Sequence, residues 1–242
     1  GYALRQQQHA ETSLGRAQAV DSLLRHLFRG MSPDEAATRT FTANELLDRT
    51  SQFIDSDPLL DGTTRRTANR TMAGLYSEIG EYDKAIKRYS DDLSDAQRAG
   101  DLARAARVLV DLAETQINAA GTDLKKLEIA ERHTDELQAL IAQGVLGGDM
   151  LAGQLSYLRG QIERSRNNPK AALTHLSDAE RKLRLVNGVE ASDRYADTMR
   201  AKGYAEADTG DLVAARKSFS DALALYRATK ERRTVLALET ST

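Results

Sequence analysis

Apolar side chains recur along the chain at the spacing of one helix face. From Leu14 an apolar stripe runs through Ala17, Val20, Leu24 and Phe28, so a helix is expected over this segment. The stripe has two interpretations. It packs on the rest of the chain, or it pairs two copies in a homodimer through Leu14, Val20, Leu24 and Phe28.

A second helix is predicted over residues 43–54. Leu46 and Ile54 belong to its apolar positions, and Asp57-Pro58 ends it, because the residue before a proline is biased away from helical conformation. We expect this helix to cap the first complete repeat of the segment that follows.

Beyond residue 60 the pattern repeats itself. In each copy a turn is followed at once by a helix with an alanine in its first turns. These alanines are Ala85, Ala130, Ala172 and Ala215, at separations of 45, 42 and 43 residues. A steady period in this range marks a solenoid built from helix pairs.

The first helix of each pair carries a small residue where the two helices are expected to cross. These small residues are Ala73, Ala113, Gly160 and Gly203. Each lies twelve residues before the alanine of its pair, except in the second copy, where the gap is seventeen. Extra residues near 121–126 therefore lengthen either a loop or a helix in that copy.

These patterns predict an all-α fold, a right-handed α-solenoid of antiparallel helix pairs with a period of about 42–45 residues. Residues 1–60 are expected to hold the N-terminal helix and the capping helix, and residues 61–242 an array of about four helix pairs. Aromatic residues make up only 5% of the chain, so alanine and leucine must do most of the packing.

Charge and cysteine content exclude several functions. The 34 basic and 36 acidic residues are interspersed and give a net charge of −2, which argues against nucleic-acid binding. The absence of cysteine excludes thiol catalysis, thiolate metal sites and disulfides. No apolar run is long enough to span a membrane.

No catalytic, cofactor or metal site is predicted. Lys84-Ala85-Ile86-Lys87 echoes a kinase lysine motif but falls in a repeat helix, and no other kinase motif occurs. The glycines of residues 144–148 follow no strand, so they are interpreted as a linker and not as a phosphate loop. The four histidines are never three or four residues apart, which disfavours a metal site on one helix.

The repeats resemble the tetratricopeptide (TPR) family. The first copy matches the family pattern at Ala73, Tyr76, Gly80, Tyr82, Ala85 and Tyr89, and the last at Gly203, Gly210, Ala215, Phe219 and Ala222. Asp92 and Glu206 depart from it, and the period is longer than the usual 34 residues of the family. The resemblance implies a long-helix variant of a protein-binding fold over residues 62–230.

The same resemblance implies a groove lined by the first helices, which could bind an extended peptide. The positions carried over are Arg70, Ser77, Arg107, Glu114, Asn118, Gln154, Tyr157, Gln161, Arg164, Arg200, Tyr204 and Asp208. For each of them the alternative is an ordinary solvated helix face. The lysine and asparagine pattern of the TPR carboxylate clamp is missing.

Residues 12–90 are similar to a segment of bacterial transmembrane serine/threonine kinases that follows the membrane helix. The similarity rests on Ala19-Val20-Asp21-Ser22-Leu23-Leu24 and on Thr42-Ala43-Asn44-Glu45-Leu46-Leu47-Asp48 ahead of the repeats. It implies a periplasmic sensor region, with a kinase domain outside this sequence and residues 1–4 as the end of the membrane helix.

The expected function is therefore a non-catalytic domain that binds a protein or peptide and transmits that binding to a membrane kinase. No nucleic acid is expected as a partner, and the only membrane link would be an upstream helix. The alternative is a cytoplasmic TPR scaffold or peptide-responsive regulator. An apolar stretch of about 20 residues before Gly1 would favour the sensor.

Overall fold

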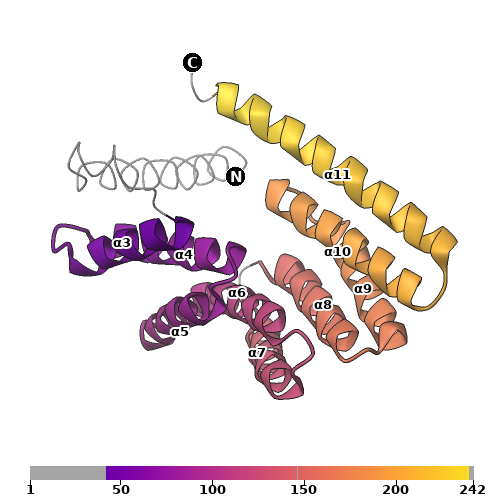
Figure 1. Ribbon diagram of the computed structural model, residues 1–242, viewed down its shortest axis with the longest axis horizontal. Coiled ribbons are helices and arrows are strands. Elements are labelled where there is room, and N and C mark those ends of the chain that lie inside the picture. Colours follow the sequence, from indigo (N-terminus) through magenta and orange to yellow (C-terminus); the bar gives the residue numbers. More distant parts are fainter. Residues whose placement is uncertain (1–41, 146, 240–242) are drawn as a thin grey trace. The chain divides into compact units, whose positions relative to one another are not determined.

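The computed structural model describes residues 42–145 and 147–239, with the side chains of 189–191 and 231–239 left undescribed. These residues form helices joined by short turns, with no strand in the described part (Figure 1). The helices are α3 (Ala43–Ser56), α4 (Gly62–Glu78), α5 (Tyr82–Arg98), α6 (Leu102–Ala120), α7 (Leu124–Ala142), α8 (Gly148–Ser165), α9 (Pro169–Leu183), α10 (Val189–Asp208) and α11 (Leu212–Glu239). The prediction of an all-α fold is confirmed.

The chain divides into two compact units, one ending at Asp92 and the other beginning at Leu93. In the second unit α6 packs on α7, α8 on α9 and α10 on α11. The pairs then stack, because α8 contacts both α6 and α7, and α10 contacts both α8 and α9. This succession of helix pairs confirms the solenoid that the repeat period predicted.

The turns that join α4 to α5, α8 to α9 and α10 to α11 share a residue with a positive φ angle. Gly80, Asn167 and Gly210 have φ angles of 83°, 59° and 88°, the left-handed region that ends a helix. After Gly210, the backbone N–H of Asp211 donates to the carbonyl of Glu206 at 2.9 Å, and Asp211 Oδ1 accepts from the N–H of Ala214. One helix therefore ends and the next begins within three residues.

Close helix crossings explain the small residues of the first helices. A Cβ atom on Gly160 of α8 would lie 2.7 Å from Leu176 Cγ of α9, and one on Gly203 of α10 would lie 2.8 Å from Phe219 Cε1 of α11. Atoms cannot approach so closely without a shift of the neighbour. The four repeat alanines, Ala85, Ala130, Ala172 and Ala215, are at most 3% exposed.

The extra residues of the second copy lie in its helices and not in a longer loop. Both α6 and α7 have 19 residues, and only residues 121–123 separate them. Of the two alternatives for the extra residues near 121–126, the structure therefore shows the helix extension.

In the first unit α3 packs on α4. Helix α3 begins with a capping box between Thr42 and Glu45, which was not predicted from the sequence. The buried Tyr76 donates to Asp48 Oδ1 at 2.7 Å, and Lys84 pairs with the same carboxylate. Lys84 thus belongs to a structural network. The predicted helix with the Leu14, Val20, Leu24 and Phe28 stripe lies outside the described residues.

Candidate protein-binding face

The first helices of the second unit, α6, α8 and α10, bring part of the predicted groove together. Among them, α8 contacts both α6 and α10. We call the set Glu114, Tyr157, Arg164, Arg194, Arg200 and Tyr204 the arginine–tyrosine face. It carries five of the predicted residues, and Arg194 is new.

At one end of this face, a guanidinium covers a tyrosine ring. Arg194 of α10 donates two hydrogen bonds, of 2.8 and 2.9 Å, to the carboxylate of Glu114 on α6. Its guanidinium carbon lies 4.9 Å from the ring centroid of Tyr157 on α8, a residue that is only 2% exposed. A planar guanidinium suits both contacts, since it binds carboxylates in a fork and stacks on aromatic rings.

The electrostatics of this end follow from burial. Burial raises the pKa of the Tyr157 hydroxyl, and the nearby Glu114 carboxylate raises it further. Burial opposes the charge of Arg194, but the attraction and hydrogen bonds of Glu114 outweigh it and raise the pKa of the guanidinium. Around neutral pH, Tyr157 therefore stays neutral and Arg194 stays charged.

The middle of the face is a second arginine–aromatic stack. Gln161 donates to the Tyr157 hydroxyl at 3.2 Å and accepts from Arg164 at 3.1 Å. The Arg164 guanidinium carbon lies 5.1 Å from the Tyr204 ring centroid. Phe219 of α11 meets Tyr204 edge to face, with the centroids 5.0 Å apart. The Tyr204 ring is thus held from two sides, yet the residue stays 44% exposed.

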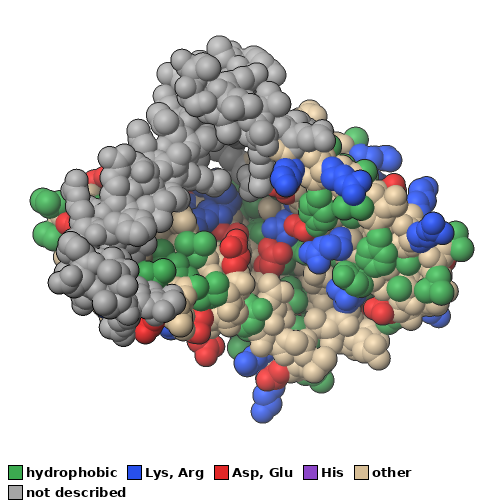
Figure 2. All heavy atoms as spheres, turned by 45° about the horizontal axis from the view of Figure 1, so that its top comes forward, with side chains coloured by type: hydrophobic (Ala, Val, Ile, Leu, Met, Phe, Trp, Pro, Cys, Tyr) green, Lys and Arg blue, Asp and Glu red, His purple; other side chains and the backbone are tan. Residues whose placement is uncertain are grey.

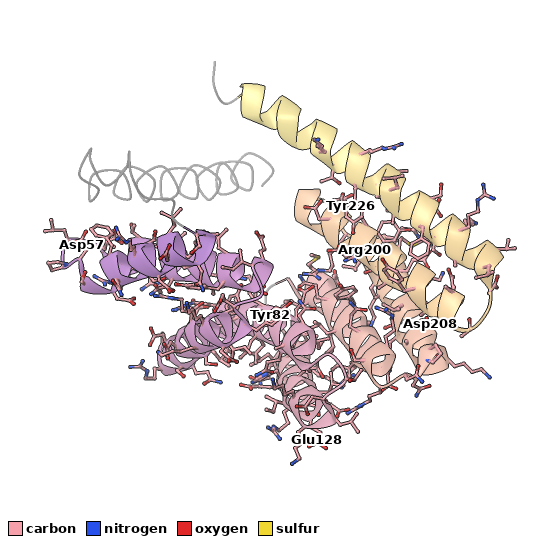
Figure 3. All side chains as sticks on the ribbon, viewed as in Figure 1. Asp57, Tyr82, Glu128, Arg200, Asp208 and Tyr226 are labelled. Atoms are coloured by element: carbon pink, nitrogen blue, oxygen red, sulfur yellow. The ribbon has the colours of Figure 1, made fainter. Side chains whose placement is uncertain are left out.

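The third arginine of the face contacts α11. Arg200 donates to the Tyr226 hydroxyl at 3.2 Å, and Tyr226 donates to Asp197 Oδ1 at 2.6 Å. Figure 3 shows Arg200 and Tyr226 next to each other, with Asp208 at the C-terminal end of α10. Asp197 also pairs with Arg200 at 3.4 Å, so this arginine has an acidic partner within its own helix.

The remaining predicted residues do not join these contacts. Arg107, Asn118 and Asp208 are exposed, and Gln154 is buried at 7% exposure. Arg70 and Ser77 lie half-buried on α4, in the first unit, and both have interaction partners there. Whether any of them contacts a ligand stays a prediction.

Three residues of the site were missed, and one of them had a signal in the sequence. Asp197 lies 43 residues after Gln154, the same interval that separates Tyr157 from Arg200. Arg194 lies one turn before Asp197, outside the family positions, and Tyr226 lies on a second helix. Neither carried a repeat signal.

The face of the molecule drawn in Figure 2 is mixed in charge. Figure 2 shows Lys and Arg side chains interspersed with Asp and Glu and with hydrophobic side chains. Residues 42–145 and 147–239 contain no group of three or more His, Asp or Glu arranged to hold a metal ion. Within the same ranges, no helix combines the length and apolar composition that crossing a bilayer requires.

Comparison with known proteins supports the fold alone. No family model and no curated protein matches the chain. Among solved structures, BtubC (BKLC) from P. vanneervenii is similar over 93% of this chain and 92% of its own, with a TM-score of 0.53 and 18% sequence identity. At this identity the likeness shows a shared all-helical fold.

Proposed function

We propose that this chain is a non-catalytic module of the TPR kind that binds a protein or peptide. The arginine–tyrosine face is the observation that supports this most directly. It places the exposed Tyr204 and three arginines on consecutive first helices, with Tyr157 buried beneath Arg194, and these residue types are enriched where proteins bind one another. Fixed helices hold the side chains in place before a partner arrives, which lowers the entropic cost of binding.

A capture experiment with a face variant tests this proposal. Arg200 and Tyr204 are the exposed members of the face, so Arg200→Ala/Tyr204→Ala removes contacts with little loss of core packing. Arg132→Ala/Lys170→Ala changes two exposed residues on the second helices α7 and α9 and serves as the matched control. A partner that the wild type and the control retain, and the face variant releases, supports the proposal. Equal retention by all three proteins contradicts this face.

The larger proposal is that the module is the periplasmic sensor region of a bacterial membrane serine/threonine kinase. It rests on the similarity of residues 12–90 to such kinases, of which the structure describes α3, α4 and the start of α5. Fractionation of cells expressing the natural gene, followed by protease treatment of spheroplasts, tests it. A membrane-bound protein whose repeats are cleaved from outside supports the sensor.

The alternative is a cytoplasmic scaffold or peptide-responsive regulator. It is favoured by the 17 to 20 residues of α4, α6, α8 and α10, because long-helix repeats of this kind resemble those of peptide-sensing bacterial regulators. A protein found only in the cytosol, with repeats that are protected in spheroplasts, favours this alternative.

A further inference from the structure

The three arginines of the arginine–tyrosine face differ in how their charges are compensated. Arg194 has the carboxylate of Glu114, and Arg200 has that of Asp197. Arg164 has no ion-pair partner among the side chains that the structure describes. Its hydrogen bond goes to the neutral side chain of Gln161, and its guanidinium lies against the Tyr204 ring.

One nitrogen of the Arg164 guanidinium is also shielded from water and lacks a hydrogen-bond acceptor among the described residues. Its Nε atom is buried and has no acceptor among the described residues. A buried donor without an acceptor is unfavourable for the folded chain. A carboxylate from outside cannot reach the covered Nε, so it would bind the terminal nitrogens of the guanidinium. The last turn of α8 is a mildly favourable place for a cation, but it supplies no acceptor to Nε.

From this difference in charge compensation we infer that Arg164 binds an aspartate or glutamate side chain of a bound peptide. The inference rests on the proposed function and names its ligand chemistry. The intramolecular pair of Glu114 with Arg194 is a template for the contact, since there a carboxylate meets a guanidinium stacked on a tyrosine ring. At Arg164 the stacked guanidinium is present and the carboxylate is left for the partner to supply.

The surroundings favour an acidic peptide over a nucleic acid. Asp197 and Glu114 belong to the same region of the unit, and the net charge of the chain is −2. A polyanion would be repelled by these carboxylates. A mostly uncharged peptide with a single carboxylate would be attracted by the uncompensated Arg164. The exposed ring of Tyr204 beside it offers apolar contact to the neighbouring peptide residue.

Three peptide pools test the inference on the full chain. All are decapeptides, N-acetylated and randomised over uncharged residues. The first has a central Glu and an amidated C-terminus, the second a central Gln and an amidated C-terminus, and the third a central Gln and a free C-terminal carboxylate. Retention of each pool on the immobilised protein is measured by mass spectrometry. The wild type is expected to retain the Glu pool about ten-fold better than the amidated Gln pool, as a hydrogen-bonded charge should.

The variants Arg164→Gln and Arg164→Lys test whether Arg164 causes the preference for the Glu pool. Both are expected to lose most of it, since lysine keeps the charge but not the planar fork. Arg159→Gln is the matched control, because Arg159 lies on the same helix and pairs with Asp135 at 3.0 Å. A Glu preference that survives in Arg164→Gln overturns the inference.

The remaining outcomes separate this inference from the proposed function. One outcome is that the wild type retains the Glu and amidated Gln pools equally and that Arg200→Ala/Tyr204→Ala retains neither. This outcome overturns carboxylate binding by Arg164 and leaves the proposed peptide binding intact. A preference for the third pool over the first shows that a chain terminus is the ligand and overturns the side-chain assignment. If no pool binds, peptide binding by this face is overturned together with the inference.

Thermal unfolding without ligand gives a second, independent test. If Arg164 is kept for a partner, Arg164→Met should leave Tm unchanged or raise it by up to about 3 °C, because an unsatisfied buried donor is removed. A fall of several degrees would mean that Arg164 serves the fold through its contact with Tyr204, and would overturn the inference.

Discussion

Glu114 and Arg194 lie eighty residues apart in the chain and make two parallel hydrogen bonds, of 2.8 and 2.9 Å. They belong to the first and third helix pairs of the second unit, which are not neighbours along the chain. In a repeat protein most stability comes from contacts within a repeat and between adjacent repeats. This ion pair adds a contact across one whole helix pair.

Breaking this ion pair is expected to destabilise the second unit. Glu114→Gln leaves the guanidinium of Arg194 without its countercharge, and because Arg194 is only 15% exposed, the free energy of unfolding should fall by about 2 kcal/mol. Urea unfolding measures this change. Arg98→Ala removes an exposed pair with Asp95 and should change the free energy by less than about 0.5 kcal/mol.

The double variant Glu114→Gln/Arg194→Gln completes the cycle. If the two residues stabilise the unit through each other, the double variant should be less destabilised than the sum of the single variants. Additive effects would mean that the pair makes no net contribution across the repeats.

The close crossing of α10 and α11 predicts that Gly203 tolerates no side chain. Gly203→Ala brings a methyl group within 2.8 Å of the Phe219 ring, and overpacking of this kind lowers stability by about 1–3 kcal/mol. Thermal unfolding followed by circular dichroism measures the loss. Gly148→Ala is the matched control, since nothing lies within 4 Å of the added Cβ. It should stabilise the protein slightly, by up to about 1 kcal/mol.

Phe219→Leu is expected to rescue Gly203→Ala in part, because a smaller side chain leaves room for the methyl group. Equal stability of Gly203→Ala and wild type would show that the two helices separate without penalty, and that the small residue is not required there.

The turn at Asn167 predicts opposite effects for two small substitutions. Asn167 has a φ of 59°, and asparagine tolerates this left-handed region better than most residues do. Asn167→Gly should raise the free energy of unfolding by a few tenths of a kcal/mol or leave it unchanged, while Asn167→Ala should lower it by about 1 kcal/mol. Chemical unfolding of both variants checks the order, and a more stable alanine variant would contradict the turn.

The pH dependence of the second unit should carry a signature of His133. Burial lowers its pKa below 6.5, with a smaller contribution from Arg132. As the pH falls through 6.5, the unfolded chain binds a proton before the folded one does, so the free energy of unfolding decreases. The decrease levels off below the folded-state pKa.

His133→Asn isolates this effect, because asparagine keeps a donor near Gln116, whose Oε1 lies 2.7 Å from His133 Nδ1. The decrease between about pH 6.5 and 5 should be smaller in this variant than in wild type. The carboxylate of Asp178 affects the free energy of unfolding in a lower pH range. Burial opposes its charge, but hydrogen bonds from Lys182, Ser156 and Arg181 lower its pKa to about 2, so its contribution is lost only below about pH 3.8.

The fold was predictable because its constraints are local and recur. Gly210 and Ala215 mark a turn and a crossing by their own chemistry, and a repeat period links such signals across the chain. The candidate site was predictable only in part. The 43-residue interval places Arg200 on the same face as Tyr157, but periodicity does not report which side chains cover each other.

The principal difference between the predicted and the observed site is the environment of Tyr157. Tyr157 was expected to face a ligand, but it is buried, and Arg194 lies over its ring. Arg194 belongs to the additional turn of a long helix, and its countercharge comes from another helix pair. Pairings of this kind depend on tertiary structure that a one-dimensional period does not contain.

The three-residue turns also determine where the chain tolerates changes of length. Within residues 209–211 the cap that ends α10 is followed directly by the cap that begins α11. A residue inserted here would therefore disrupt both caps. Residues 184–188 separate α9 from α10 without such a shared motif. A reporter domain or an affinity tag inserted there should leave both neighbouring helix pairs folded, which makes this connection the place to attach a probe for partner binding.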